Sequence, residues 1–422
     1  MSEPLIFLLM LSVYIILTLF FKVPVGLSLG GAAVAGAMVG GFGIPWRHLV
    51  EGGFGYLDTI LIILTATIFI KTLEASGTLD TGVNFFLRSF YRQKALLLIV
   101  LMLIVMFPAM ITGSSVTAIL STGPLVAPVL LRLGLDRAKA AAFIAIGGIL
   151  GMIAPPVNIL VMIMGAGVDM PYVGITAPLL IITVPLLIFS SLWVGLRGGK
   201  EIKKEEVLGM LPPSCWPQYG WRLLVPLLCL LFLFIAPSLW PKFIPDLGLP
   251  AYFTIASLFS WVSGKPFSFL QATQKAIEES LPILIILAGV GMFTQIMTLT
   301  GSRGWVVVTT LALPSALLIL GMMFSLPLFG GISTFGAASI LGVPFILALI
   351  NLNALLTTTS LSAMAAIGDL VPPAAFSARF AAQVTGESSI FRIHRHLLLP
   401  ALSIWLMGLV ILLLAPLLDK WI

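Results

Sequence analysis

The same pattern of helix-breaking residues occurs twice in this sequence, at an offset of 217 residues (330 − 113). A glycine-rich stretch, at Gly113 and again at Gly330, precedes a double proline by 42 residues in each copy (155 − 113 and 372 − 330). Proline lacks the backbone N–H of a helix and clashes with the preceding turn, so each Pro-Pro pair interrupts an otherwise apolar helix. Lipid cannot satisfy the carbonyls that such a break frees, so the break has to be buried in protein or line a cavity.

Composition places the chain in a membrane. Of its 422 residues, 59% are hydrophobic and only 9% are charged, and the mean hydropathy is +1.16. Soluble domains carry about 25% charged residues, and several apolar runs here exceed the roughly 18 residues that indicate a membrane-spanning helix. The net charge of +6 lies in short loops. Membrane topology and contact with anionic lipid explain it better than binding of nucleic acid.

A hydrophilic stretch at 197–220 divides the chain into two transmembrane halves, 1–196 and 221–422. Each half holds one copy of the repeated pattern of breaks. Interrupted apolar segments at matching places in two halves are the best sequence indication of a transporter's binding site. We therefore predict an all-α polytopic membrane protein whose binding site lies where the breaks meet.

Residues 95–130 form an apolar run that is longer than one membrane crossing at about 1.5 Å per residue. This run is interrupted near its centre, which predicts a re-entrant helical hairpin, followed by a Pro-Pro-broken helix at about 140–167. The second half repeats both pieces, with a hairpin at about 320–349 and a broken helix at about 353–376. Uninterrupted spans are expected at roughly 4–21, 24–43, 55–73, 173–196, 222–240, 248–263, 281–299, 304–319 and 397–418.

The first pair of breaks is rich in uncharged oxygen ligands. Hydroxyls follow the glycine turn of the hairpin, and carbonyls are expected to be freed around Gly148 to Gly151 before the double proline. An uncharged cage of oxygens suits Na⁺, which unwound backbone and half-helix C-termini coordinate in transporters. The hydroxyls of Ser114, Ser115 and Thr117 and the carbonyls from Gly148 to Gly151 are therefore candidate ion ligands. Thr117 and Asn158 are also candidate substrate contacts.

The second pair of breaks differs by one ionisable residue, Asp369. A carboxylate within a membrane break is costly and is a functional candidate by default. It could ligate a cation, take up a proton, repel an anionic substrate, or only cap a helix beside the Pro-Pro break. The hydroxyls of Ser333 and Thr334 are candidate ion ligands here, and Thr357 and Asp369 are candidate substrate contacts.

No motif of an enzyme is present. The sequence contains no Walker loop, Rossmann fingerprint, HExxH or serine-nucleophile elbow, so neither ATP hydrolysis nor an organic cofactor is expected. A membrane-embedded enzyme would also need a cluster of His, Asp and Glu at the midplane, and the apolar spans hold none. We therefore expect no catalytic residues.

The stretch from Ile111 to Gly165 carries Gly-Ser-Ser-x-Thr-Ala and then Ala-x-x-Ala-x-Gly-Gly-x-x-Gly-x-x-x-Pro-Pro. It resembles the large membrane subunit of the TRAP (tripartite ATP-independent periplasmic) transporters, a DctM-like permease. The resemblance implies an elevator-type secondary transporter with two inverted repeats and Na⁺-coupled uptake of small organic acids. It also implies a small four-span membrane subunit, a periplasmic substrate-binding protein, and a place in the inner (cytoplasmic) membrane of a bacterium or archaeon.

By motif, the resemblance implies that Gly113, Ser114, Ser115, Gly148, Gly151 and Pro155 belong to the family's first Na⁺ site. It carries Gly330, Ser333, Thr334, Gly368 and Pro372 over to the second Na⁺ site. This sequence departs from the family's pattern at Ile149, where threonine is usual, and at Val157, where serine often follows the double proline. The second hairpin lacks an acidic residue that the family often carries, and Asp369 stands where a neutral residue is usual. The rival interpretations are a stand-alone ion-coupled anion carrier that needs no binding protein and, further off, a channel that passes solute without ion coupling.

Overall fold

The computed structural model describes residues 2–196, 214–349 and 351–418, and these residues contain helices and turns but no strand. The helices of the first half are α1 (Glu3–Ile15), η1 (Ile16–Phe20), α2 (Val25–Val39), α3 (Trp46–Gly53), α4 (Leu57–Ala75), α5 (Thr78–Phe90), α6 (Lys94–Thr112), α7 (Ser115–Ser121), α8 (Gly123–Arg132), α9 (Arg137–Met152), α10 (Ile159–Ala166) and α11 (Thr176–Leu196).

The second half has the same kind of elements. They are α13 (Trp216–Tyr219), η2 (Gly220–Leu224), α14 (Val225–Leu239), α15 (Leu249–Ser263), α16 (Phe269–Leu299), α17 (Ser302–Leu311), α18 (Ser315–Gly330), α19 (Thr334–Ala337), η3 (Ala338–Gly342), α20 (Val343–Ala348), α21 (Ala354–Ala366), η4 (Ile367–Leu370), α22 (Phe376–Thr385) and α23 (Ile390–Leu418).

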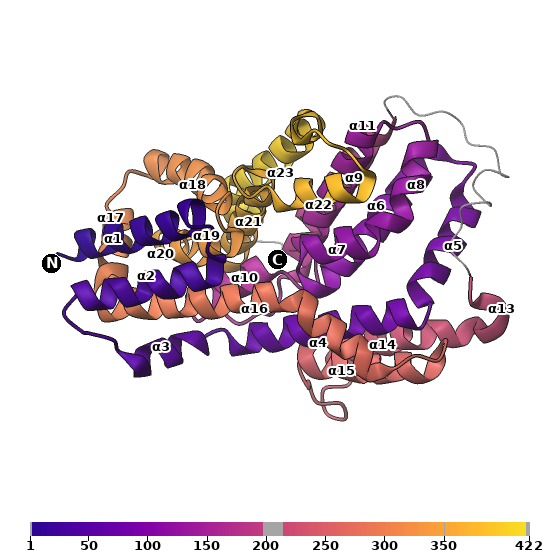
Figure 1. Ribbon diagram of the computed structural model, residues 1–422, viewed down its shortest axis with the longest axis horizontal. Coiled ribbons are helices and arrows are strands. Elements are labelled where there is room, and N and C mark those ends of the chain that lie inside the picture. The colour runs from indigo at the N-terminus through magenta and orange to yellow at the C-terminus, as the bar shows by residue number, and fades with distance from the viewer. Residues whose placement is uncertain (1, 197–213, 350, 419–422) are drawn as a thin grey trace.

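The helices form two groups that lie side by side in Figure 1. In one group the long helix α16 packs against α2, α3 and α4, and α15 packs against α4. The other group holds both hairpins and both broken segments, with α6, α9 and α11 packed together and α21 packed on α23. We call the first group the scaffold and the second the hairpin group. The predicted all-α polytopic class is confirmed.

The elements of the two halves follow the repeat seen in the sequence. Helices α9 and α21 begin 217 residues apart (354 − 137), and so do α10 and α22 (376 − 159). Both Pro-Pro bonds are cis. After each double proline one backbone N–H returns to its own hairpin: that of Val157 bonds the carbonyl of Met110 at 3.1 Å, and that of Ala374 bonds the carbonyl of Gly331 at 3.0 Å.

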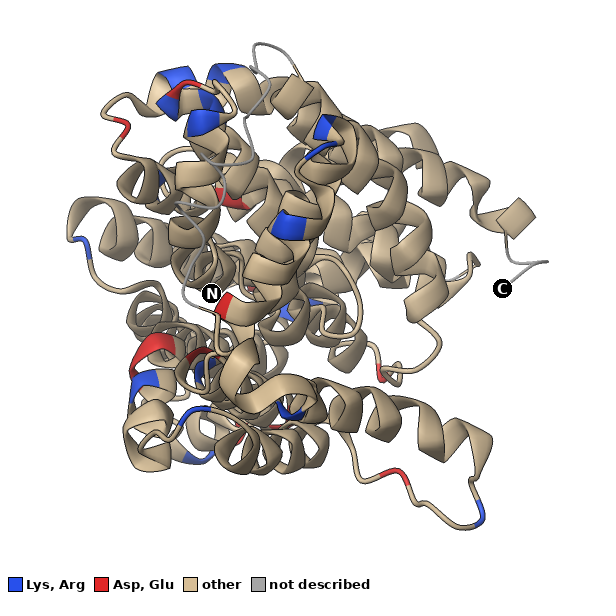
Figure 2. Ribbon diagram, turned by 90° about the vertical axis from the view of Figure 1, so that its right-hand side faces the viewer, with Lys and Arg blue, Asp and Glu red and all other residues tan. Residues whose placement is uncertain are grey.

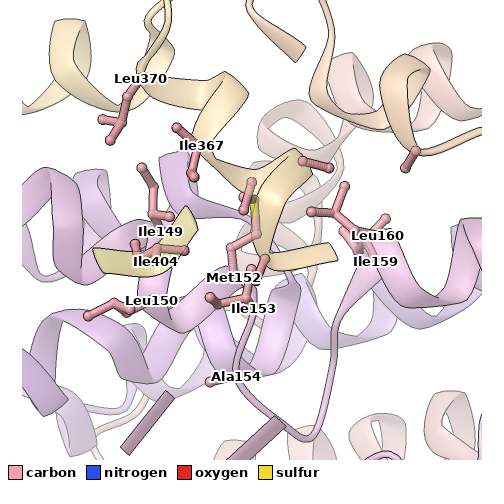
Figure 3. Close-up of a cluster of buried hydrophobic side chains, with 14 of the residues drawn as sticks. Ile149, Leu150, Met152, Ile153, Ala154, Ile159, Leu160, Ile367, Leu370 and Ile404 are labelled. Carbon is pink, nitrogen blue, oxygen red and sulfur yellow. The ribbon is translucent and has the colours of Figure 1, made fainter. Parts of the chain in front are cut away.

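The two broken segments lie against each other and run in opposite directions. At one end Arg137, which begins α9, donates to the carbonyl of Gly386, which follows α22. At the other end Leu355, in the first turn of α21, lies against Gly174, which follows α10. Apolar side chains fill the crossing between them. Figure 3 shows those of the first break, such as Met152 and Ile153, beside Ile367 and Leu370 of η4.

The span expected at 304–319 is wrong. Helix α17 covers only Ser302–Leu311, and Pro314 then separates it from α18. A proline disfavours the helical conformation of the residue before it, and ten residues are too few to cross a bilayer. Six described helices are long and apolar enough to cross, or up to eight if bent pairs are counted. Most of the hydrophilic linker, 197–213, lies outside the described residues.

Basic turns of the two halves lie together at one end of the hairpin group, which we call the basic end. Arg137 meets Gly386 there, Lys139 and Arg395 border one cavity, and Gly195 beside Leu98 brings the start of α6 to the same place. Arg303 lies at the other end of the broken segments, where it donates to the carbonyl of Gly167 after α10. Figure 2 looks onto the right-hand side of Figure 1, and most of the ribbon there is uncharged (tan). The basic turns of both halves therefore share one end.

Candidate functional site

The turn of the first hairpin depends on glycine. Gly113 ends α6 with a φ of 67°, in the left-handed region that other residues avoid. A Cβ on Gly113 would also lie 2.4 Å from the side chain of Ile159. Ser114 then caps α7, because its hydroxyl accepts the backbone N–H of Thr117 at 3.3 Å. The cap leaves the hydroxyl of the next residue, Ser115, free to face away from its own helix.

The second hairpin is built in the same way, with one closer contact. Ser333 caps α19 by accepting the backbone N–H of Gly336 at 3.0 Å. Behind this turn, Gly330 of α18 lies directly on Gly368 of η4, and a Cβ on Gly368 would be 2.4 Å from the Cα of Gly330. This contact fixes the neighbouring residue, Asp369, beside the hairpin turn.

Asp369 joins the two hairpins. Its Oδ2 accepts hydrogen bonds from Ser115 Oγ and, at 3.0 Å, from Ser377 Oγ. Its Oδ1 accepts one from Thr334 Oγ1 at 3.1 Å. The side chain is buried, with 8% exposure, and no ion pair with Lys or Arg is found for it in the described parts of the chain. We call these residues (Ser115, Thr334, Asp369 and Ser377) the hydroxyl–carboxylate cluster.

A cavity of about 320 Å³ opens onto this cluster, and we call it the tip cavity. Its walls come from both hairpin turns, from α22 and from the scaffold helices α2 and α16. Six of the residues selected from the sequence line it: Ser114, Ser115, Thr117, Ser333, Thr334 and Asp369. The structure thus brings hydroxyls of the two halves to one space.

Other selected residues act in packing. A Cβ on Gly148 would lie 2.9 Å from the carbonyl oxygen of Ser115, and one on Gly151 would lie 2.4 Å from that of Met106. Helix α9 continues through both glycines to Met152, and the carbonyl of Gly151 accepts the N–H of Ala154 at 3.1 Å. The backbone therefore opens after Met152, later than the sequence indicated, because only the double proline ends the helix.

The two double prolines differ in their surroundings. Pro155 is buried behind the first hairpin, whereas Pro372 is exposed. The chain beyond Pro372 borders a second cavity through its neighbour Pro373. The break of the second half is therefore the more accessible one.

Asn158 and Thr357 are fully buried and do not line the tip cavity. The amide oxygen of Asn158 caps α10 by accepting the N–H of Val161 at 3.1 Å, and its amide nitrogen donates to Ile153 O and Ser362 Oγ, both at 3.2 Å. The repeat places Ala375, which has no capping group, at the matching position before α22 (375 − 158 = 217). The geometry therefore gives Asn158 a structural task.

We expect Asn158→Ala to lower the stability of the protein while leaving ion binding intact. The substitution removes a helix cap and leaves a buried carbonyl and a hydroxyl without their donor, which together cost about 1–3 kcal/mol. Thermal unfolding in detergent, followed by tryptophan fluorescence, measures the loss, and Ser12→Ala at an exposed position of α1 serves as a control. An unchanged unfolding temperature would contradict the structural role.

Three residues of the site were not selected from the sequence. Ser377 lies in the first turn of α22, after the second double proline. It has no counterpart in the repeat, since Leu160 stands at the matching position. Glu278 and Glu279 reach the tip cavity from the scaffold helix α16. Glu279 pairs with Lys71 of α4 at 2.7 Å. These three residues reach the site only because helices that are distant in the sequence pack together. Periodicity and motif spacing therefore do not predict them.

The long apolar helices, the paired membrane breaks and the cavity between the two hairpin turns define a multi-pass membrane protein of the transporter class. The sequence matches the family described as "Tripartite ATP-independent periplasmic transporter, DctM component" over residues 12–418. The chain therefore belongs to the DctM family, the membrane permease component of TRAP transporters. The resemblance to TRAP permeases is confirmed, and so is the expectation that the chain is not an enzyme.

Among solved structures, the fold is similar to the crystal structure of the YdaH transporter of Alcanivorax borkumensis, with a TM-score of 0.61. The alignment covers 87% of each chain at 14% identity, which shows a shared fold alone. No curated protein sequence matches the chain. In TRAP systems the DctM component works with a small membrane subunit and a periplasmic binding protein.

Proposed function

We propose that this chain is the permease of a Na⁺-driven importer of small organic acids in the inner membrane of a bacterium or archaeon. The observation that carries the proposal is the hydroxyl–carboxylate cluster, in which Asp369 receives Ser115 from one hairpin and Thr334 from the other. A buried carboxylate is normally paired with a cation or coordinates a metal. Since Asp369 has only hydroxyl partners among the described residues, a small cation is the partner that best completes it.

The chemistry of the cluster suits Na⁺. Hydroxyl oxygens both donate and accept, so Ser115, Thr334 and Ser377 can turn their lone pairs toward an ion held by Asp369. Backbone carbonyls near the hairpin turns supply further oxygens of the kind that Na⁺ takes in broken-helix transporters. In this proposal no organic cofactor is needed, and Na⁺ is the coupling ion.

The orientation that we propose places the basic end in the cytoplasm, because cytoplasmic loops of membrane proteins are enriched in Lys and Arg. The end of α11 at Leu196 then lies on the same side, since Gly195 packs against Leu98 near the start of α6. The first hairpin enters from the cytoplasm and the second from the opposite side, as inverted repeats. The hairpin group would then carry ion and solute past the scaffold in an elevator-type movement.

The proposal is tested by uptake into proteoliposomes that contain the full chain, its four-span subunit and the cognate periplasmic binding protein. Radiolabelled mono- and dicarboxylates, with pyruvate and succinate as first probes, are supplied with an inward Na⁺ gradient or with choline. We expect Na⁺-dependent uptake of an acid that the binding protein recognises. Uptake that is equal in both salts would contradict Na⁺ coupling, and uptake without the binding protein would favour the stand-alone carrier.

Binding of ²²Na⁺ to the purified chain tests the ion site without knowledge of the solute. We expect Ser115→Ala and Thr334→Ala to weaken binding by about tenfold each, because each removes one oxygen ligand worth roughly 1–1.5 kcal/mol. Ser403→Ala, which removes a hydroxyl bonded only to its own helix, is the matched control. Unchanged affinity in both site variants would mean that the repeated breaks are only structural.

A further inference from the structure

A second cavity adjoins the tip cavity on one side. Its volume is about 700 Å³, and its walls come from the turn between η1 and α2, from α16 and from the second Pro-Pro break. Both cavities are lined by Val25, Pro282, Ile286, Ile332 and Phe376. We call this second cavity the basic vestibule, because its charged residues are both basic.

Lys22 and Arg379 face the basic vestibule from the two groups of helices. Lys22 lies in the scaffold turn after η1 and holds a φ of 54°, which residues other than glycine rarely adopt. Arg379 lies in the first turns of α22 and donates from Nη2 to the carbonyl of Pro373 at 2.6 Å. Within the described parts of the chain neither is in an ion pair, and the vestibule lining contains no Asp or Glu.

The tip cavity has the opposite character. Its ionisable lining residues are Glu278, Glu279 and Asp369, with no Lys or Arg among them. Two adjoining spaces therefore carry opposite charge, one suited to a cation and the other to an anion. An anion drawn into the vestibule would meet the ion of the hydroxyl–carboxylate cluster across the shared wall.

We propose that the basic vestibule binds the carboxylate group of the transported acid, with Lys22 and Arg379 as its counter-charges. This inference rests on the proposed function, since it names the part of the chain that recognises the acid. The Arg379 guanidinium has five donors in a fork that matches a carboxylate, and the bond to Pro373 uses only one of them. Lys22 adds a point charge from the scaffold, so the acid bridges the two groups of helices.

The electrostatic part is tested with a reporter cysteine and charged thiol reagents. The background is the full chain with Cys215→Ser and Cys229→Ala, and the reporter is Leu19→Cys, an exposed apolar position in the vestibule wall. Reaction rates are measured with the anionic sulfonatoethyl and the cationic trimethylammonioethyl methanethiosulfonates. The ratio of the anionic to the cationic rate reports the local potential independently of any solute.

We expect Lys22→Gln and Arg379→Gln each to lower this ratio by about threefold, and the double variant by about tenfold. A charge in the same cavity acts oppositely on the two reagents, and salt screens it only beyond about 10 Å. Arg88→Gln on α5, an exposed charge at the basic end that lines neither cavity, should leave the ratio unchanged. A ratio that is the same in all variants would overturn the proposal, and so would an equal fall in the control.

The recognition part is read in the uptake assay, with the acid that the unsubstituted protein transports. We expect both single variants to raise the half-saturating concentration of the acid by about tenfold, with the dependence on Na⁺ unchanged. An unchanged half-saturating concentration would overturn this inference and leave Na⁺ coupling intact. If the unsubstituted protein shows no Na⁺ dependence, the coupling proposal fails, whereas the thiol measurement still decides the charge of the vestibule.

Discussion

Asp369→Asn is expected to reduce the affinity for ²²Na⁺ by about 100-fold or more and to abolish Na⁺-driven uptake. A unit charge a few ångströms from a cation is worth several kcal/mol even at an effective dielectric constant of about 20, and an amide dipole replaces only part of it. Asparagine has the size of aspartate, and its amide oxygen can still accept from Ser115 or Thr334. The loss therefore comes from charge and not from packing.

The control for this substitution is Asp246→Asn. Asp246 is also a hydrogen-bonded carboxylate, accepting from Tyr252 at 2.7 Å and from the backbone of Gly248 at 2.9 Å, but it lies in a loop away from both cavities. The Asp246→Asn variant should bind Na⁺ with the affinity of the unsubstituted protein. Na⁺ binding that survives in Asp369→Asn, with an unfolding temperature close to that of the unsubstituted protein, would remove Asp369 from the ion site.

Gly368→Ala is expected to destabilise the protein by about 1–3 kcal/mol, the usual effect of overpacking, and to weaken Na⁺ binding at the same time. The added Cβ would lie 2.4 Å from the Cα of Gly330 and 2.5 Å from its carbonyl carbon. Both atoms belong to backbone, so no side chain can turn aside to make room. Helix α18 has to separate from η4, and Thr334 then moves away from the neighbouring Asp369.

Thermal unfolding and ²²Na⁺ binding measure the two effects of Gly368→Ala. The matched control is Gly321→Ala on the same helix α18, where a Cβ meets nothing within 4 Å. This control should be neutral or stabilising, since alanine favours a helix over glycine by about 1 kcal/mol. Equal unfolding temperatures in the two variants would contradict the close contact of the two glycines.

Much of the fold follows from the sequence because proline and glycine act locally. Each double proline ends the helix before it, α9 in the first half and η4 in the second, whatever the tertiary surroundings. The 217-residue repeat then predicted both hairpins and both broken segments. The span predicted at 304–319 was wrong because the helix-breaking effect of Pro314 was not considered. The break predicted at Gly148 and Gly151 was placed too early, since close packing keeps both glycines helical.

The site was harder to predict because its members meet only through tertiary structure. Ser115 and Thr334 could be selected as hydroxyls at breaks, and Asp369 as a charge in an apolar segment. Their contact was not readable, since Ser115 and Asp369 are 254 residues apart in the chain. Ser377 and Arg379 depend on the direction in which α22 leaves the second break, and one-dimensional patterns carry no such information.

The sequence divides this chain into two halves, but the antiparallel broken segments give it one shared interior. Helix α9 of the first half packs on α22 of the second, α10 packs on α21, and a single apolar core includes residues of both. Neither half has a complete inner surface without the other. If the hairpin turns hold Na⁺ as proposed, opening one of them would disturb the wall of its counterpart, and we expect loading and release to involve both halves together.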